Sequence, residues 1–322
     1  MESTARPQDV QAAAGAGTRK PISAWRRRLS RDKYLYMLLL PVAIYFLLFK
    51  YGPLFGEIIA FKNYRLMEGI WGSPWVGFDQ FRKLFTSRDF LEILRNTLLL
   101  NVYGLVFAFP VPIILALMLN ELRSEWYKRV LQNFLYIPHF MSWIVLGSIV
   151  IAILSPSTGV VNSVLKLLGF EPVYFMASTF WWPISFVGSS IWREAGFGTI
   201  LYLAAMASID PSLYEAAAID GANKWRQMWH VTLPGIRSTV AILLVLQMGR
   251  MMDVGFEHVF ALQNSAVGSV SEVISTYVYK RGIVGLQYSY TTALGLFQSV
   301  VSLVLVVMVN RLIRAMGERG LW

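Results

Sequence analysis

The chain has 322 residues, of which 56% are hydrophobic and only 15% are charged, a composition too apolar for a soluble domain and typical of a membrane protein. It contains no cysteine, which excludes disulfides and thiolate chemistry, and its three scattered histidines give no metal-binding spacing. The net charge of +10 comes without the interleaved basic and aromatic residues of a nucleic-acid-binding surface.

The amino-terminal tail, residues 1–32, is rich in Ala, Gly, Pro, Arg and Gln and lacks apolar periodicity, so we predict that it is disordered. Its basic residues gather just before the first apolar segment, at Arg26, Arg27, Arg28, Arg31 and, following the tail, Lys33. Basic flanks stay on the cytoplasmic side of a membrane helix. We therefore expect a cytoplasmic amino terminus, followed by a membrane domain over residues 33–322.

Six segments contain the roughly 20 apolar residues that are needed to cross the hydrocarbon core. They are residues 34–60, 97–119, 134–154, 180–207, 238–260 and 290–311. Six crossings return the carboxyl terminus to the cytoplasm, in agreement with its basic residues Arg311, Arg314 and Arg319. The predicted fold class is an all-α, polytopic six-helix transmembrane bundle with both termini cytoplasmic.

Two outer connections are long enough to have structure of their own. Residues 62–95 include a Trp-, Pro- and Gly-rich run at 71–81, which favours an ordered interfacial loop. Residues 155–175 predict a turn and then a short helix that ends at Gly169 and lies along the outer face. Neither connection resembles a catalytic site, but a substrate-delivery protein would have to dock on these surfaces.

The fourth predicted span carries charges near its middle, at Arg193 and Glu194. An unpaired charge there costs at least ~2.5 kcal/mol, so these residues either line a substrate pathway or form a structural ion pair between helices. We favour the pathway. Trp192 is placed to stack on a sugar ring, whereas Trp181 and Trp182 fit an aromatic belt at the membrane interface.

A second charged group follows at Arg250, Asp253 and Glu257. Spacings of three and four place these residues on one side of a helix if the fifth span is continuous. The chain could equally leave the membrane early, with Arg250 onward at the outer interface. The candidate substrate-pathway residues are therefore Trp192, Arg193, Glu194, Arg250 and Asp253.

The polar stretch between the fourth and fifth spans, residues 210–234, has clear helix signals. Asp210 can cap a helix that has Pro211 in its first turn and runs to about Asp220, and Gly221 can end it. A second short helix is expected over residues 224–231, stopped by Leu233 and Pro234. Taken alone, such a loop could simply lie on lipid headgroups.

The spacing in this stretch argues for a more specific role. It reads E-A-A from Glu215, three residues, Gly221, nine residues and V-T-L-P ending at Pro234, and it resembles the cytoplasmic loop of ABC importer permeases, with Val231 in place of Ile. The resemblance implies a cytoplasmic coupling helix that docks on a separate ATPase subunit. The implied coupling residues are Tyr214, Glu215, Ala216, Ala217, Asp220, Gly221, Leu233 and Pro234.

Four further segments are similar to the carbohydrate-uptake branch of this family, and most similar to permeases for oligosaccharides from alginate- or pectin-type polysaccharides. They are residues 191–206, 256–264, 272–283 and 290–312. The likeness implies the type I importer fold in a bacterial inner membrane, with 33–322 as the permease domain and alternating access as the mechanism. It also implies a second related permease subunit, an extracytoplasmic solute-binding protein and two ATPase subunits that hold ATP and Mg.

The chain itself has no G-x-x-x-x-G-K-[ST] phosphate loop and no recognisable hydrolase or zinc motif, so we expect neither an enzyme nor a cofactor on it. An ion-gradient-driven secondary transporter would fit the buried charges and broken helices, but it leaves the coupling loop unexplained. A non-transporting scaffold would leave the charges without a purpose. Arg193 and Arg250 would suit a carboxylated sugar, although Glu194 could cancel this preference.

Overall fold

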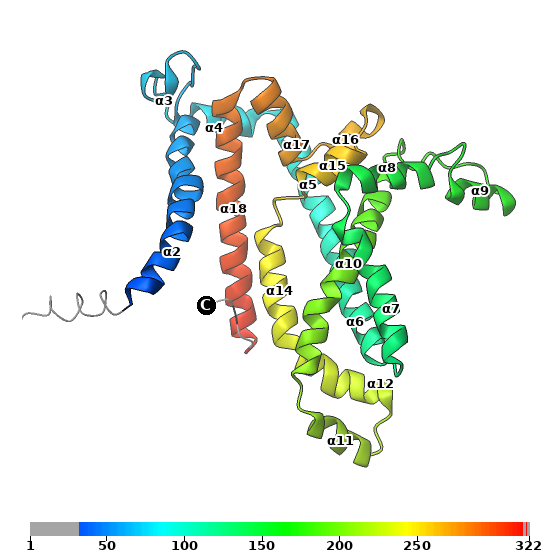
Figure 1. Cartoon of the computed structure of the whole chain (residues 1–322). Helices are drawn as coiled ribbons and strands as arrows, with labels where there is room; N and C mark the ends of the chain where they lie inside the picture. The colour runs from blue at the N-terminus through cyan, green and yellow to red at the C-terminus, as the bar shows by residue number, and fades with distance from the viewer. Residues whose placement is uncertain (1–31, 318–319, 321–322) are drawn as a thin grey trace, which may run out of the picture. The chain divides into compact units, whose positions relative to one another are not determined.

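The computed structural model describes residues 32–317 and 320, which are mostly helical and contain no strand (Figure 1). They fall into two units, one that ends at Ile58 and one that begins at Ile59. The first unit is a helical run formed by α2 (Lys33–Phe46), the π-helical turn η1 (Leu47–Tyr51) and most of η2 (Gly52–Phe61). The predicted disordered tail, apart from Asp32, lies outside the described residues.

The second unit contains all the remaining helical elements of the described residues. In chain order, they are α3 (Gly69–Gly72), α4 (Asp79–Thr86), α5 (Arg88–Tyr103), η3 (Gly104–Ala108), α6 (Pro110–Asn120), α7 (Glu125–Tyr136), η4 (Ile137–Phe140), α8 (Trp143–Ile153), α9 (Val160–Leu167), α10 (Trp181–Ala207), α11 (Pro211–Ile219), α12 (Lys224–Gln227), η5 (Met228–Thr232), α13 (Leu233–Gly235), α14 (Arg237–Gly249), α15 (Phe256–Leu262), η6 (Ser265–Val267), α16 (Gly268–Ser271), α17 (Ile274–Val278), η7 (Tyr279–Val284) and α18 (Tyr288–Ala315).

Among the described residues, three helical runs are long and apolar enough to cross a membrane, and two bent pairs bring the number to five if each pair is one span. The three runs are Lys33–Phe61, Arg88–Asn120 and Tyr288–Ala315, which contain the first, second and sixth predicted spans. Helix α10 contains almost all of the fourth predicted span and has 27 residues, which is ample length. Because two charged residues lie near its centre, α10 is less apolar than the three runs named above and is not counted with them.

The third predicted span is not one straight helix. Glu125–Phe140 and Trp143–Ile153 meet at an angle of 106°. Pro138 lacks the N–H that would continue the first helix, Met141 is extended, and the Ser142 hydroxyl accepts the N–H of Val145 at 3.3 Å to begin α8. These residues redirect the chain after η4.

The fifth predicted span also ends earlier than expected, because α14 stops at Gly249 rather than continuing to Phe260. The next residues form a turn in which the Asp253 carboxylate accepts the N–H of Gly255 at 2.9 Å, and Gly255 has a φ of +87° that favours glycine. Arg250 and Asp253 therefore do not share one helix face with Glu257. The end of α14 at Gly249 is compatible with the alternative expectation, in which the chain leaves the membrane early and Arg250 onward lies at the outer interface.

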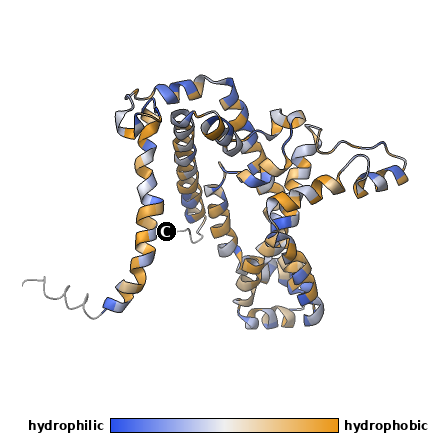
Figure 2. Cartoon of the chain, turned by 45° about the horizontal axis from the view of Figure 1, so that its top comes forward, coloured by the Kyte–Doolittle hydropathy of each residue, from blue (hydrophilic) through white to orange (hydrophobic). Residues whose placement is uncertain are grey.

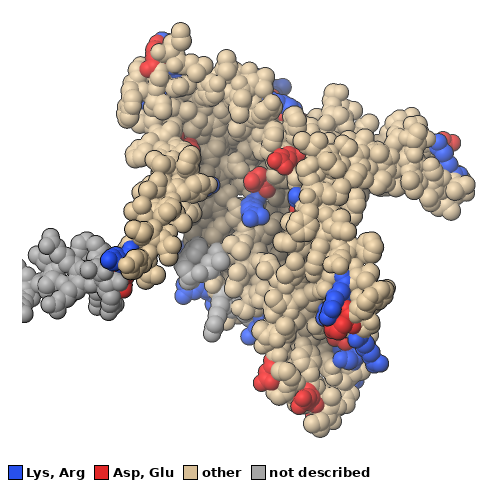
Figure 3. All heavy atoms as spheres, in the orientation of Figure 1, with Lys and Arg blue, Asp and Glu red and all other residues tan. Residues whose placement is uncertain are grey.

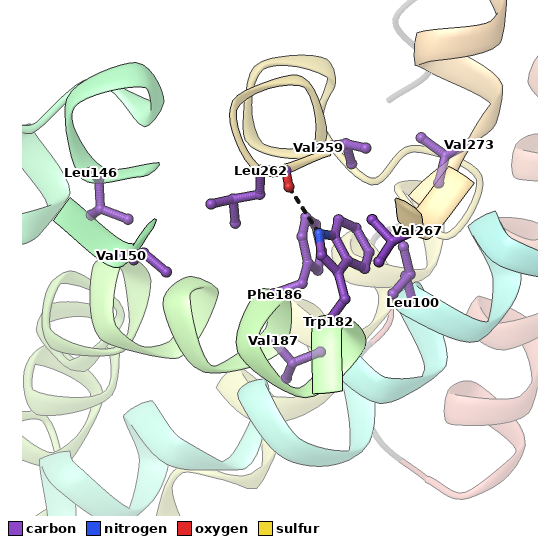
Figure 4. Close-up of a cluster of buried hydrophobic side chains, with 10 residues drawn as sticks. All are labelled: Leu100, Leu146, Val150, Trp182, Phe186, Val187, Val259, Leu262, Val267 and Val273. Atoms are coloured by element: carbon purple, nitrogen blue, oxygen red, sulfur yellow. Dashed lines mark hydrogen bonds between the residues drawn. The ribbon is translucent and has the colours of Figure 1, made fainter. Parts of the chain in front are cut away.

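A buried apolar cluster lies where α10 packs against α5, α8 and α15 (Figure 4). Trp182 is completely buried in it, and its indole N–H donates to the carbonyl of Leu262 at 2.9 Å (Figure 4). The prediction that Trp182 belongs to an interfacial belt is therefore wrong. On the outside of the helices, hydrophobic residues remain along much of their length (Figure 2).

A glycine allows helices α7 and α10 to lie close together. A Cβ on Gly196 of α10 would overlap the backbone carbonyl of Leu135 on α7, whereas a Cβ on Gly188 of the same helix would meet no atom within 4 Å. Helix α7 can approach α10 this closely only because residue 196 has no side chain.

We predict that Gly196→Ala destabilises the purified chain by about 1–3 kcal/mol, the usual effect of overpacking a close contact. Size-exclusion chromatography after heating in detergent would show a lower apparent melting temperature. Gly188→Ala is the matched control and should leave the melting temperature unchanged. Equal melting curves for the two variants would contradict the close contact between α7 and α10.

Candidate functional site

The first helix of the predicted loop, α11, begins as the sequence indicates. The Asp210 carboxylate accepts the N–H of Ser212 at 2.9 Å, and Pro211 occupies the first turn. These hydrogen bonds favour the charged carboxylate and lower the pKa of Asp210 below its usual value. The predicted helix start is confirmed.

The end of α11 is confirmed at Gly221, which has a φ of +74°. The N–H of Ala222 donates to the carbonyl of Ala217 at 2.9 Å, and the N–H of Gly221 donates to the carbonyl of Ala218 at 3.1 Å. This pair of hydrogen bonds is a Schellman motif, which satisfies the last carbonyls of a helix and fixes the direction in which the chain leaves it.

The second helix is longer than predicted. The Asn223 side chain caps α12 by accepting the N–H of Arg226 at 2.9 Å, and the helix continues through η5 to the end of α13 at Gly235. The prediction that Leu233 and Pro234 stop this helix is therefore wrong for Pro234, which lies within it. The wide π-turn η5 precedes Pro234, which falls in the first turn of α13, where its missing N–H is tolerated.

Polar contacts hold the two helices of the loop together. The Tyr214 hydroxyl and the buried Thr232 hydroxyl are 3.0 Å apart, and the Gln227 side-chain amide donates to the carbonyl of Ala222 at 3.2 Å. At the base of the loop, Gly235 lies so close to Ile209 that a Cβ would not fit. We refer to α11, α12, η5 and α13 together as the coupling loop, after the loop that its sequence resembles; it follows the end of α10.

The coupling loop exposes a small-sided face of α11. Glu215, Ala216 and Asp220 are exposed, Ala217 is half-buried, and Ile219 is 87% exposed. Neither Glu215 nor Asp220 makes a hydrogen bond or an ion pair with any described residue. The remaining predicted residues, Leu233 and Pro234, lie on the other arm, half-buried and exposed respectively. Acidic and basic side chains both lie around this end of the second unit (Figure 3).

The charges of α10 lie against the bend between η4 and α8. The Arg193 guanidinium pairs with Glu194, donates to the carbonyl of Met141 at 3.2 Å and lies over the Trp143 ring at 4.5 Å. The second Glu194 oxygen contacts His139 Nδ1 at 2.9 Å. Both charges are thus satisfied by neighbouring groups, of which His139 and Trp143 were not foreseen because no local pattern links them to α10.

The other predicted pathway residues lie apart from this pair. Trp192 is 43% exposed and lines an apolar cavity of about 320 Å³ beside α8, together with Trp181 and Ser189. Arg250 and Asp253 are exposed after the end of α14, and no hydrogen bond or ion pair within the described residues joins them to Arg193 or Glu194. The structure therefore brings together two of the five predicted residues by direct contact.

The second unit is a set of largely apolar helices with the polar coupling loop at one end (Figure 1). The model of the family "binding-protein-dependent transport system inner membrane component" matches residues 108–319. The chain belongs to this family of ABC transporter permeases, and as such it is a membrane component that is not itself catalytic.

Individual relatives and solved structures are also similar over nearly the whole chain. Protein LplB of Bacillus subtilis is 46% identical over 100% of both chains, and the polygalacturonan/rhamnogalacturonan transport system permease protein YteP of the same organism is 46% identical over 92% of both. A chain from the crystal structure of a bacterial alginate ABC transporter in complex with an alginate pentasaccharide-bound periplasmic protein superposes with a TM-score of 0.85. It is 42% identical, over 92% of this chain and 99% of that chain.

We predict that Tyr214→Phe loosens the coupling loop, because it leaves the buried Thr232 hydroxyl without its partner. The free energy of local unfolding of α11 should fall by about 1 kcal/mol, which raises amide hydrogen exchange in this helix roughly fivefold. Tyr174→Phe, at an exposed tyrosine outside the loop, is the control. Unchanged exchange in α11 would mean that this hydrogen bond does not hold the loop together.

Proposed function

We propose that the chain is one of two related permease subunits in an ATP-driven importer that carries an oligosaccharide from an extracytoplasmic binding protein into the cytoplasm. The observation that carries this proposal is the coupling loop. Its exposed face of small side chains beside the carboxylate of Glu215 is suited to a groove on another protein, since small side chains allow close approach and Glu215 supplies a charged contact.

The partner at that face is an ATPase subunit, and ATP and Mg bind there rather than to this chain. Tyr214, Ala216, Ala217 and Asp220 complete the docking face or support it. Leu233 and Pro234 position the second arm, and Gly221 sets the angle between the arms. The turn at Gly221, closed by two hydrogen bonds, supports the role of this residue in setting the angle between the arms.

Movement of the coupling loop would pass directly into the bundle. Only three residues, Ser208, Ile209 and Asp210, separate α10 from α11, and Ile209 packs against Gly235 at the base of the loop. When ATP closes the two ATPase subunits, α11 is drawn with them and α10 follows as a rigid body. The bundle then alternates between inward-open and outward-open states, each with its own affinity for ATP and for sugar.

The orientation of the chain in the membrane follows from the proposed contact between the coupling loop and an ATPase subunit. Helix α18 ends toward the same end of the second unit as the coupling loop (Figure 1), which supports a carboxyl terminus on the ATPase side of a bacterial inner membrane. The basic cluster before Tyr34 supports a cytoplasmic amino terminus as well. The opposite end, with α9 and α15, then faces the binding protein.

For the substrate we propose an acidic oligosaccharide. Its support is the named cargo of similar proteins, polygalacturonan or rhamnogalacturonan in one and alginate in another, together with guanidinium groups that suit carboxylates. The proposed pathway residues are Trp192, Arg193, Glu194, Arg250 and Asp253. The test is ATP hydrolysis by the reconstituted complex with its binding protein, which oligogalacturonides or alginate oligosaccharides should stimulate and neutral oligosaccharides of equal length should not.

We predict that Glu215→Lys lowers both uptake and binding-protein-stimulated ATP hydrolysis by about 100-fold, because it reverses a charge inside a protein contact. The chain should still reach the membrane in normal amounts, as shown by immunoblotting. Glu215→Gln, which keeps the shape of the side chain, should give an intermediate defect. Normal uptake by Glu215→Lys would remove the coupling role.

We also expect Gly221→Val to uncouple the complex, since a β-branched residue at a positive φ costs about 1–2 kcal/mol even where there is room for its side chain. Gly221→Asn, which tolerates this backbone conformation, is the matched control and should retain most of the uptake measured with labelled sugar. Equal transport by the two variants would contradict a role for the turn.

Arg193→Ala should raise the concentration of acidic oligosaccharide needed for half-maximal ATPase stimulation by about tenfold, and Arg193→Lys should recover only part of this loss because it lacks the guanidinium fork. The amount of assembled complex is measured first, since Arg193 also supports the bend before α8. Stimulation that is unchanged in Arg193→Ala, or that falls equally for acidic and neutral sugars, would identify a structural ion pair instead.

A further inference from the structure

His258 on α15 lies between two aromatic rings from other helices. Its imidazole stacks on the Trp143 ring of α8 at 3.6 Å between centroids, with 12° between the planes, and on the Phe186 ring of α10 at 3.8 Å and 16°. The residue is buried. Neither the loop motif nor the intramembrane charges of the sequence point to it.

The stack continues on both sides of His258. The Arg193 guanidinium lies over the Trp143 ring at 4.5 Å, and Trp182 stacks on Phe186 at 5.1 Å and 22°. Five flat groups from α8, α10 and α15 thus follow one another, with His258 in the middle. Stacked aromatic and cation–π contacts each add stabilisation beyond simple burial.

Two hydrogen bonds fasten α15 to α10 at the same place. The Ser189 hydroxyl lies 2.9 Å from His258 Nε2, and the Trp182 indole N–H donates to the Leu262 carbonyl at 2.9 Å (Figure 4). Val259 and Leu262 of α15 also belong to the apolar cluster that contains Trp182. Helix α15 is therefore attached to α10 at both of its ends.

The connection of α15 to α14, the helix that precedes it in the sequence, has no regular helical structure. Between α14 and α15 the chain passes through residues 250–255, which are not helical and end at Gly255 with its φ of +87°. A segment of this kind can absorb backbone rotation while the helices on either side remain rigid. Within this segment Met252 is fixed, because it is completely buried and its carbonyl accepts the side-chain amide of Gln298 on α18 at 2.8 Å. The less constrained part of the link is therefore residues 253–255.

We propose that His258 is a positioning residue that makes α15, at the outer end of the second unit, move with α10 instead of with α14. This inference rests on the proposed function, in which the coupling loop drives α10. Helix α10 is continuous over 27 residues, about 40 Å, from the stack to the coupling loop. The nucleotide state of the ATPase subunits is thereby communicated to the surface that receives the binding protein, and residues 253–255 are the hinge.

The first test uses the whole complex in proteoliposomes and compares ATP hydrolysis with and without sugar-loaded binding protein. In His258→Ala the ratio of stimulated to basal hydrolysis should fall roughly tenfold, within the usual range of coupling between sites. His258→Phe keeps the stacked ring and should restore most of the ratio, whereas a residue needed only for folding would lower basal and stimulated rates together. Absence of stimulation in the unsubstituted complex would instead refute the proposed function.

The second test measures distances, for which the absence of cysteine from the chain allows spin labels at chosen exposed positions. Labels at Ile184 on α10 and Glu257 on α15 should keep one distance with and without ATP, while labels at Leu246 on α14 and Glu257 should change theirs. In His258→Ala the distribution of distances between the labels at Ile184 and Glu257 should become broader. A change between Ile184 and Glu257 in the unsubstituted complex, or no effect of His258→Ala on either the ratio or the distances, would overturn the inference.

Discussion

The positive charge of Arg193 has to be matched in the middle of a long helix with apolar surroundings, where an isolated charge would cost at least ~2.5 kcal/mol. Glu194 neutralises it, the Trp143 ring covers it, and the Met141 carbonyl accepts one of its N–H groups. That carbonyl is available because the chain is extended at Met141 rather than helical. The break between η4 and α8 therefore supplies a partner for the charge, and the charge in turn holds the broken ends in place. Trp143, fixed in this way, supports the stack on His258.

The coupling loop depends on interactions of much shorter range. Its cap at Asp210, its turn at Gly221 and its second cap at Asn223 are all closed by hydrogen bonds that span no more than five residues. The contact between Tyr214 and Thr232 then ties the two arms together. A loop built in this way holds its exposed face in one orientation before any partner arrives, which reduces the ordering entropy lost on docking. In the proposed function, the contact between Ile209 and Gly235 at its base would pass a displacement of the loop to α10.

This difference in range explains what the sequence could predict. Helix starts and ends at Asp210, Gly221 and Gly169 follow from the conformational preferences of single residues and their immediate neighbours, and they were predicted correctly. The bend at residues 138–142 and the burial of Trp182 depend on packing between distant segments. His139 meets Glu194 across 55 positions, and Ser189 meets His258 across 69. A single sequence holds no pattern that pairs such residues. Pro234 was also predicted wrongly from the sequence. The π-turn that precedes it allows a proline at a position where it would otherwise end the helix.

The same geometry bears on how an acidic sugar would be recognised. Arg193 already has a carboxylate partner, so an anionic ligand must compete with Glu194 for the guanidinium, and Glu194 has a second partner, His139, to hold it when it is displaced. In such an exchange Glu194 keeps its hydrogen bond to His139, and ligand binding is favoured only in a state that separates Arg193 from Glu194. Arg250 is exposed and lies outside that ion pair, in the segment that separates α14 from α15. On the proposed pathway, Arg250 would therefore offer a carboxylated sugar an accessible guanidinium. The exchange at Arg193 would follow as α10 moves, so that recognition of charge is linked to the change of state.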